Sequence, residues 1–136
     1  MKQFSSKRSI QILGHVLQQY GIDKMVISPG SRNAPLAIHF SELDSFECFS
    51  IIDERSAAFV AMGMAKSLKQ PVAISCTSGS AATNYYPAVV EAFYQNVPLL
   101  VLTADRPTDF VDLFDGQTIR QKNVFHQHSY GDFELL

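Results

Sequence analysis

The sequence contains no block of like charges and almost no net charge. Its 136 residues include 11 Lys and Arg against 13 Asp and Glu, which gives a formal net charge of −2. Proteins that bind nucleic acid or anionic membrane surfaces usually carry a basic patch or stripe. The composition therefore gives no support to a nucleic-acid or membrane partner.

Cysteines and long apolar runs are also scarce. The two cysteines, Cys48 and Cys76, stand far apart inside apolar stretches and form no CxxC motif. We interpret both as small buried side chains of a protein in a reducing compartment. The N-terminal residues are basic, but no apolar segment there is long enough for a signal peptide or a membrane span. These absences predict a soluble, cytoplasmic domain.

The four histidines do not form a ligand set. His15 and His39 fall in helical patterns, and His126 and His128 are two residues apart in a loop. The sequence also lacks the HExxH and HxxEH motifs, a carboxylate-rich calcium loop and the GxSxG elbow of serine hydrolases. We therefore expect no metal site made by this chain alone.

Apolar side chains make up 46% of the chain, which is enough for one domain with its own core. The expected strands cover residues 24–28, 46–52, 72–76 and 98–103. The expected helices cover residues 10–20, a stretch capped by Asn33 that opens near Pro35, and residues 55–68 and 81–93. Such alternation predicts an α/β fold, with a doubly wound parallel sheet covered by helices on both faces.

Two parts of the chain are less regular. Pro87 lies inside the expected 81–93 helix, where proline removes a hydrogen bond, and it predicts a kink or a late start. After the fourth strand we expect a loop over 107–123 with a short helix at 117–121. Residues 126–136 are compatible with the start of a fifth strand. Because no helix follows to cover that strand, we expect the domain to be truncated at its C-terminus.

Polar turns follow all four expected strands. They read SPGSRN at 28–33, DERS at 53–56, TSGS at 77–80 and ADRP at 104–107. Ligands of parallel α/β sheets bind at the carboxyl ends of the strands, so four such turns predict a polar cleft that contains arginines. Single polar turns are common without any ligand, so this prediction depends on all four.

Taken one at a time, these turns leave alternatives open. Arg32 suits a carboxylate or phosphate near a helix N-terminus, although a lone arginine is more often a solvated surface residue. Glu54 is either a helix-start carboxylate or a buried group that needs a specific partner. The small residues at 77–80 would let a ligand approach the backbone closely. Arg106 has a structural role if it pairs with Asp105.

In chain order, the motifs resemble those of one enzyme family. The resemblance is carried by ISPGSRNAPLAI, IDERSAAF, TSGSAATN, LTADRP and GQTIRQ, and it covers residues 22–125. The family is that of the 2-succinyl-5-enolpyruvyl-6-hydroxy-3-cyclohexene-1-carboxylate synthases, thiamine-diphosphate enzymes of menaquinone biosynthesis, and the similar part is their N-terminal pyrimidine-binding domain. ERSAAF and TSGSAATN are typical of the whole thiamine-diphosphate superfamily. PGSRNAPL, LTADRP and GQTIRQ point to this member.

The resemblance implies roles for eight residues. Glu54 matches the glutamate that hydrogen-bonds N1′ of the cofactor aminopyrimidine, which favours the imino tautomer that deprotonates thiazolium C2. Three residues match a turn that lines the cofactor pocket: Thr77, Ser78 and Gly79. Four residues match positions around the acceptor isochorismate, whose carboxylates suit two guanidinium groups: Ser31, Arg32, Arg106 and Gln117.

The resemblance also implies a reaction and further domains. Enzymes of this family are transferases that decarboxylate 2-oxoglutarate and add the succinyl carbanion equivalent to isochorismate in a 1,4-addition. They are several times longer, and a C-terminal domain without a counterpart here holds the diphosphate with Mg2+ or Mn2+. The active site lies between two subunits. We therefore expect residues 1–136 to be a partial pyrimidine-binding domain, inactive in isolation, from a homodimer or homotetramer.

Two other interpretations stay open. The chain could belong to another thiamine-diphosphate 2-oxoacid decarboxylase or synthase, which would not need Arg32, Arg106 and Gln117. It could also be a non-catalytic α/β module that binds an anion or mediates dimerisation.

Overall fold

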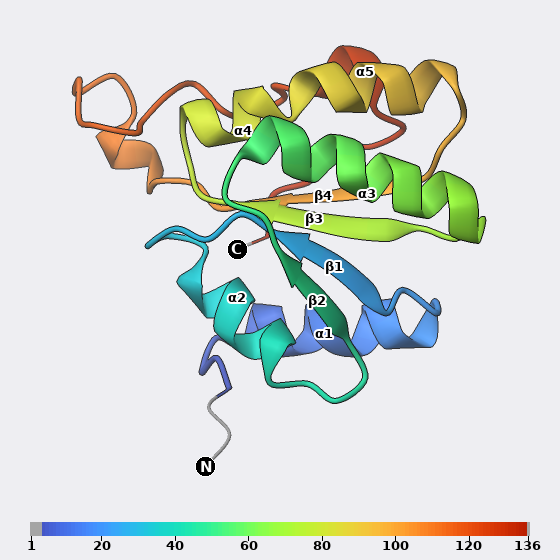
Figure 1. Cartoon of the computed structure of the whole chain (residues 1–136). Coiled ribbons are helices and arrows are strands. Elements are labelled where there is room, and N and C mark those ends of the chain that lie inside the picture. Colours follow the sequence, from blue (N-terminus) through green and yellow to red (C-terminus); the bar gives the residue numbers. More distant parts are fainter. Residues whose placement is uncertain (1–3, 136) are drawn as a thin grey trace.

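Four parallel strands form the centre of the fold (Figure 1). The structure is a computed structural model that describes residues 4–135, so residues 1–3 and 136 lie outside the described part. The strands are β1 (Lys24–Ile27), β2 (Glu47–Ser50), β3 (Val72–Cys76) and β4 (Leu99–Thr103). They lie in the order β2-β1-β3-β4, and every neighbouring pair is parallel. Each lies within a stretch that the sequence predicts as a strand.

Helices cover both faces of this sheet, as the sequence predicts (Figure 1). One face carries α1 (Arg8–Gln19) and α2 (Ala34–Ser41). The other carries α3 (Glu54–Leu68), α4 (Ser80–Asn84) and α5 (Tyr86–Tyr94). Two short 3-10 helices follow β4: η1 (Thr108–Phe110) and η2 (His126–His128). Of the helices within residues 4–135, none has the length and apolar character needed to cross a membrane.

The two faces of the sheet form two separate apolar cores. Val26 and Ile74 are fully buried in the core that α3, α4 and α5 cover. Met25, Ile27 and Ala73 belong to the core on the α1 and α2 side. Successive side chains of a strand point to opposite faces, so each strand contributes to both cores. This double burial is why the strands are almost continuously apolar in the sequence.

Asn33 stands at the N-cap of α2, as expected, but its side chain does not cap the helix. Its Nδ2 atom instead donates a hydrogen bond to the backbone oxygen of Ser28, at 3.0 Å. Because Asn33 is fully buried, this bond ties the turn after β1 back onto the strand itself. The expected capping hydrogen bond is therefore wrong.

The expected helix at 81–93 is divided into α4 and α5 around Tyr85. Pro87 lies in the first turn of α5, where its missing N–H has no helical partner to lose. Of the kink or late start that the proline predicts, the structure shows the late start, because a second helix begins at Tyr86. Tyr85 is fully buried at the junction of the two helices.

No helix forms at 117–121, so that prediction is wrong. Gln117 has a φ of 59°, in the left-handed region that a continuing α-helix does not use. The backbone there follows contacts with the turn after β3 and not its own helical periodicity.

The expected fifth strand is also absent from the described part of 126–136, and Leu136 lies outside that part. After η2 the chain has no regular structure, and its aromatic rings pack on α5. The His128 and Tyr130 rings lie 5.7 Å and 5.4 Å from the Phe93 ring, between centroids. Packing against a helix therefore takes the place of pairing with β4.

Small side chains let α3 lie close to the sheet. Four alanines of α3 have no exposed surface: Ala57, Ala58, Ala61 and Ala65. Their three- and four-residue spacing forms one stripe on the helix. A larger side chain in this stripe would have to push the helix away from β3.

We therefore predict that Ala61→Leu lowers the free energy of unfolding by about 1–3 kcal/mol through overpacking. The matched control is Gly63→Ala on the same helix, where an added β-carbon meets nothing within 4 Å. That control should raise stability by about 0.5–1 kcal/mol. Urea unfolding followed by circular dichroism measures both changes. Equal stability of the Ala61→Leu variant and the parent would contradict the close packing of α3.

Candidate active site

The four polar turns meet at the edge of the sheet where the strands end, which we call the strand-end rim (Figure 1). It consists of residues 28–33, 51–54, 77–79 and 104–106, which follow β1, β2, β3 and β4. Parallel strands bring their carboxyl ends to one edge, and this edge is the usual ligand side of such sheets. A further stretch, residues 107–121, leaves β4 and folds back against the rim.

Gln117 is the point where three of the predicted site residues meet. Its side-chain oxygen accepts a hydrogen bond from Arg32 Nη1 at 2.7 Å. Its backbone oxygen accepts one from Ser78 Oγ at 2.8 Å. The structure thus brings Arg32, Ser78, Gly79 and Gln117 together, although Gln117 is 39 residues beyond Ser78.

Gly79 permits the close approach of Gln117. It has a φ of 80°, and a β-carbon built on it would lie 2.8 Å from the Gln117 carbonyl. Few residues other than glycine adopt that backbone conformation, and none with a β-carbon would fit the space. The close approach expected of a ligand at Gly79 is therefore made by the chain itself.

Gln121 holds the same stretch against the rim, a role that the sequence analysis does not predict. The residue is buried, and its Oε1 accepts a hydrogen bond from the Gly79 N–H at 2.9 Å. Its Nε2 donates to Thr103 Oγ1 at 3.1 Å and to the Ala104 oxygen at 2.8 Å. One amide side chain therefore joins the end of β4 to the turn after β3. A second glutamine in the GQTIRQ motif was the only sequence signal for it.

Arg106 is half-buried and pairs with Asp115, not with Asp105. Its Nη2 atom lies 2.6 Å from Asp115 Oδ2 and donates to the Gly116 oxygen at 3.2 Å. The Asp105 carboxylate accepts a hydrogen bond from the backbone N–H of Arg106 at 2.7 Å. The alternative of an Asp105 side-chain pair is therefore wrong.

Glu54 is the first residue of α3 and is half-buried. Its position lies between the two alternatives of the sequence analysis, a helix-start carboxylate and a buried group that needs a specific partner. Asp53 caps the helix, because its carboxylate accepts a hydrogen bond from the Ser56 N–H at 2.7 Å. The hydrogen bonds from Ser56 lower the pKa of Asp53. Within residues 4–135 no hydrogen bond or ion pair holds the Glu54 carboxylate.

The charge of Glu54 acts on two buried groups at the end of β3. Burial raises the pKa of the Cys76 thiol to about 12, and the Glu54 carboxylate adds to that rise. Burial likewise raises the pKa of Tyr85, with a smaller contribution from Glu54. Cys76 is fully buried, as expected, whereas Cys48 is only half-buried; both are free thiols. Glu54 therefore faces the β3 side of the rim.

Two buried oxygens in the turns after β1 and β3 have no hydrogen-bond partner among the described residues. They are Asn33 Oδ1 and Thr77 Oγ1. A β-carbon on Gly30 would lie 2.7 Å from Thr77 Cβ, so the turns after these strands are pressed together. Buried polar atoms without partners are rare in folded proteins and mark places where a ligand or water can bind.

Ser31 is exposed and lies apart from the Gln117 contacts. It lines a shallow hollow of about 430 Å³ together with residues 4–7 and the first residues of α2. Three of the eight predicted site residues have side chains without a hydrogen bond in the described chain. They are Ser31, which is exposed, Glu54, which is half-buried, and Thr77, which is buried.

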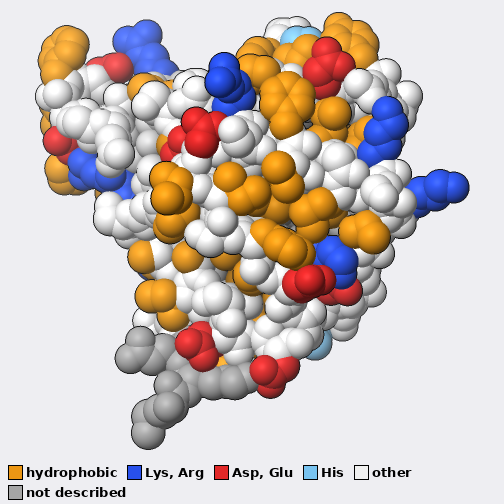
Figure 2. All heavy atoms as spheres, in the orientation of Figure 1, with side chains coloured by type: hydrophobic (Ala, Val, Ile, Leu, Met, Phe, Trp, Pro, Cys, Tyr) orange, Lys and Arg blue, Asp and Glu red, His pale blue; other side chains and the backbone are white. Residues whose placement is uncertain are grey.

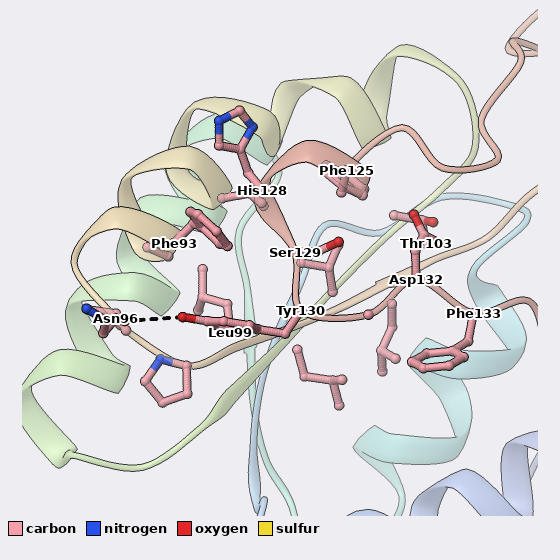
Figure 3. A pocket seen from close by; sticks show the side chains of 18 of the residues that line it. Phe93, Asn96, Leu99, Thr103, Phe125, His128, Ser129, Tyr130, Asp132 and Phe133 are labelled. Carbon is pink, nitrogen blue, oxygen red and sulfur yellow. Dashed lines mark hydrogen bonds between the residues drawn. The ribbon is translucent and has the colours of Figure 1, made fainter.

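A separate cavity of about 580 Å³ lies along the edge strand β4 (Figure 3). α5 and residues 128–135 enclose it. The Tyr130 hydroxyl donates a hydrogen bond to Asn96 Oδ1 at 3.2 Å. Its lining is mostly apolar, and it contains none of the eight predicted site residues. The candidate active site is therefore the strand-end rim and not this cavity. Within residues 4–135, no three His, Cys, Asp or Glu side chains gather as a metal site.

Comparison with known proteins shows to which protein family the chain belongs. Residues 8–133 match the family model described as "Thiamine pyrophosphate enzyme, N-terminal TPP binding domain". The chain belongs to this family. The crystal structure of benzoylformate decarboxylase from Polynucleobacter necessarius has the same fold, with a TM-score of 0.71 and 20% sequence identity, over 81% of this chain and 20% of that one.

The relatives found by sequence similarity point to one enzyme within this class. The chain is 62% identical over 116 residues to the 2-succinyl-5-enolpyruvyl-6-hydroxy-3-cyclohexene-1-carboxylate synthase of Flavobacterium psychrophilum, covering 85% of this chain and 21% of that enzyme. It is 50% identical over 130 residues to the synthase of the same name from Desulfotalea psychrophila, covering 96% and 24%. The resemblance that the motifs indicate is confirmed. The chain spans about a fifth of the length of these relatives.

We predict that Gln121→Met lowers the free energy of unfolding by about 1–3 kcal/mol, because it leaves the buried Gly79 N–H without an acceptor. The 105–120 stretch should also become more sensitive to limited proteolysis while the sheet stays folded. The control Gln127→Met, at an exposed position, should change stability by less than about 0.5 kcal/mol. Urea unfolding and mapped cleavage sites measure both effects. Unchanged protection of 105–120 would contradict the role of Gln121.

Proposed function

We propose that this chain supplies the pyrimidine half of the active site of a 2-succinyl-5-enolpyruvyl-6-hydroxy-3-cyclohexene-1-carboxylate synthase. Such a transferase would decarboxylate 2-oxoglutarate and add the four-carbon unit to isochorismate, a step of menaquinone biosynthesis. The observation that carries the proposal is a Glu54 carboxylate that has no hydrogen-bond or ion-pair partner among residues 4–135 and lies on the same rim as Arg32 and Arg106. The similarity to the two synthases supports it.

The residues of the rim fit thiamine diphosphate. Glu54 is half-buried, and its carboxylate has no protein hydrogen bond in the described chain, so it is available to a ring nitrogen of the cofactor. Thr77 Oγ1 is buried without a partner, whereas Ser78 Oγ and the Gly79 N–H already bond Gln117 and Gln121. Of the three predicted cofactor-binding residues, Thr77 therefore keeps the most hydrogen-bonding capacity. Ser78 and Gly79 would shape the pocket wall.

When bound, thiamine diphosphate supplies the nucleophilic carbon and the electron sink that decarboxylation of a 2-oxoacid requires. Glu54 would hold a proton against the N1′ atom of the aminopyrimidine and so keep that ring in its basic tautomer. A half-buried carboxylate is suited to this, because partial desolvation strengthens the hydrogen bond.

The acceptor would bind at the other part of the rim. Isochorismate carries two carboxylates, and Arg32 and Arg106 offer two guanidinium groups that suit carboxylate oxygens. Gln117 already contacts Arg32 and would add an amide to the same place. Ser31, at the exposed end of the turn, would supply a hydroxyl.

Parts of the site would come from outside this chain. Mg2+ or Mn2+ would bind with the diphosphate on another domain, and the enzyme would work as a homodimer or homotetramer in the cytoplasm. Figure 2 shows apolar side chains gathered on the surface over α3 and α5. The exposed apolar side chains of this region include Ile52, Phe59, Val60 and Tyr94. Ile52 and Phe59 lie close to Glu54 in the chain, and an exposed apolar patch that includes them supports the docking of a second protein surface over the cofactor.

We predict that Glu54→Gln in the full-length enzyme lowers turnover by about a hundredfold or more, because the amide cannot hold the proton as a carboxylate does. The thermal midpoint should stay within a few degrees of the parent. Glu91→Gln, on the exposed side of α5, serves as the matched control and should leave turnover unchanged. Steady-state kinetics with both substrates measures the effect. Parental turnover in Glu54→Gln would sink the cofactor assignment.

A second prediction concerns the acceptor. Arg106→Ala should raise the KM for isochorismate by about tenfold or more, because a charged hydrogen bond contributes about 1.5–3 kcal/mol. The KM for 2-oxoglutarate should change far less. Arg8→Ala, on the exposed surface of α1, controls for the loss of a positive charge. Equal effects of Arg106→Ala on both KM values would remove Arg106 from the acceptor site.

A further inference from the structure

The guanidinium of Arg106 is already partly occupied by an acidic side chain of the same chain. Asp115 Oδ2 lies 2.6 Å from Nη2, and the Gly116 oxygen accepts from the same nitrogen at 3.2 Å. The Arg106 side chain is 21% exposed and that of Asp115 is 42% exposed. The other ion pair of this stretch, Arg120 with Asp112, is far more exposed. The Arg106 contact is therefore the less screened of the two.

The occupation of Arg106 is incomplete. Its Nε atom is buried and has no hydrogen-bond partner in the described chain. Phe110 covers the guanidinium at 5.9 Å from its ring centre, which lowers access of water from that side. Asp115 reaches one nitrogen only, whereas a carboxylate aligned with the fork of an arginine can accept two parallel hydrogen bonds. A second carboxylate could therefore bind this arginine more strongly than Asp115 does.

Both arginines of the rim are held by the same three-residue stretch. Asp115 contacts Arg106, and Gln117 contacts Arg32 through a neutral amide. Gly116 between them has open space around its α-carbon, and Asp115 lies on the exposed side of the stretch. Of the two contacts, only that of Asp115 is between charges, so only it opposes the binding of an anion electrostatically.

We propose that Asp115 is a specificity-determining residue, an internal carboxylate that competes with a carboxylate of the acceptor for Arg106. The inference rests on the proposed function, in which Arg106 binds the acceptor. Asp115 has two effects on the rim. It keeps the Arg106 side chain in place when no substrate is bound. It also weakens the binding of acids whose carboxylate cannot displace Asp115 from Arg106.

The test is Asp115→Asn in the full-length enzyme, which removes the charge and keeps the shape. The KM for isochorismate should fall by about twofold to fivefold, because an ion pair at a partly exposed site contributes up to about 1 kcal/mol. The KM for 2-oxoglutarate and kcat should change by less than about twofold. Asp109→Asn, an exposed aspartate of the same stretch, controls for the change in net charge and should have no effect. An unchanged or raised KM for isochorismate in Asp115→Asn would overturn the proposal.

The Arg106→Ala background separates this proposal from the proposed function. If Asp115 acts through Arg106, Asp115→Asn should have no effect on the KM for isochorismate once the arginine is gone. A persistent fall in that background would overturn the inference. Should Arg106→Ala itself leave the KM for isochorismate unchanged, the acceptor site of the proposed function fails. If Arg106→Ala raises it and Asp115→Asn does not lower it, the inference alone fails.

Discussion

The rim of this domain depends on one close approach, that of the Gly79 backbone to Gln117. A β-carbon at Gly79 would lie 2.8 Å from the Gln117 carbonyl, so any other residue would force the stretch after β4 away from the turn after β3. Contact at this distance lets the Gln117 backbone oxygen accept a hydrogen bond from Ser78 and its side-chain oxygen accept one from Arg32. The glycine thus admits a segment of its own chain, and the placement of the arginines follows from that contact.

A buried amide makes this approach stable. Residues 107–121 contain no strand and one short 3-10 helix, so few backbone hydrogen bonds of their own hold them in place. Gln121 supplies what is missing, because both ends of its amide are paired with backbone or hydroxyl groups of the rim. An unpaired buried amide costs free energy, so conformations in which residues 107–121 move away from the rim and leave Gln121 unpaired are disfavoured.

The sequence predicts an element well when the residues that determine its conformation lie close together in the chain, and poorly when they lie far apart. The strands and α3 follow from local patterns, since a run such as 72–76 is apolar on both faces and the alanines of α3 repeat at helical spacing. Pro87 marked the break between α4 and α5 for the same local reason. The 107–121 stretch is different. Gln117 is held by Ser78, 39 residues earlier in the chain, and the short helix expected at 117–121 does not form. The motifs identified most of the site residues, but not the role of Gln121 or the pairing of Arg106 with Asp115.

The strand order keeps Glu54 and Arg106 apart on the rim. Glu54 follows β2 at one edge of the sheet, and Arg106 follows β4 at the other edge. Within the described residues neither arginine pairs with Glu54: Arg32 is held by Gln117 and Arg106 by Asp115. An arginine beside Glu54 would favour the bare carboxylate and weaken its hold on a proton. A carboxylate that must share a proton with a cofactor ring can therefore function on the same rim as two guanidinium groups, because the fold gives those groups other partners.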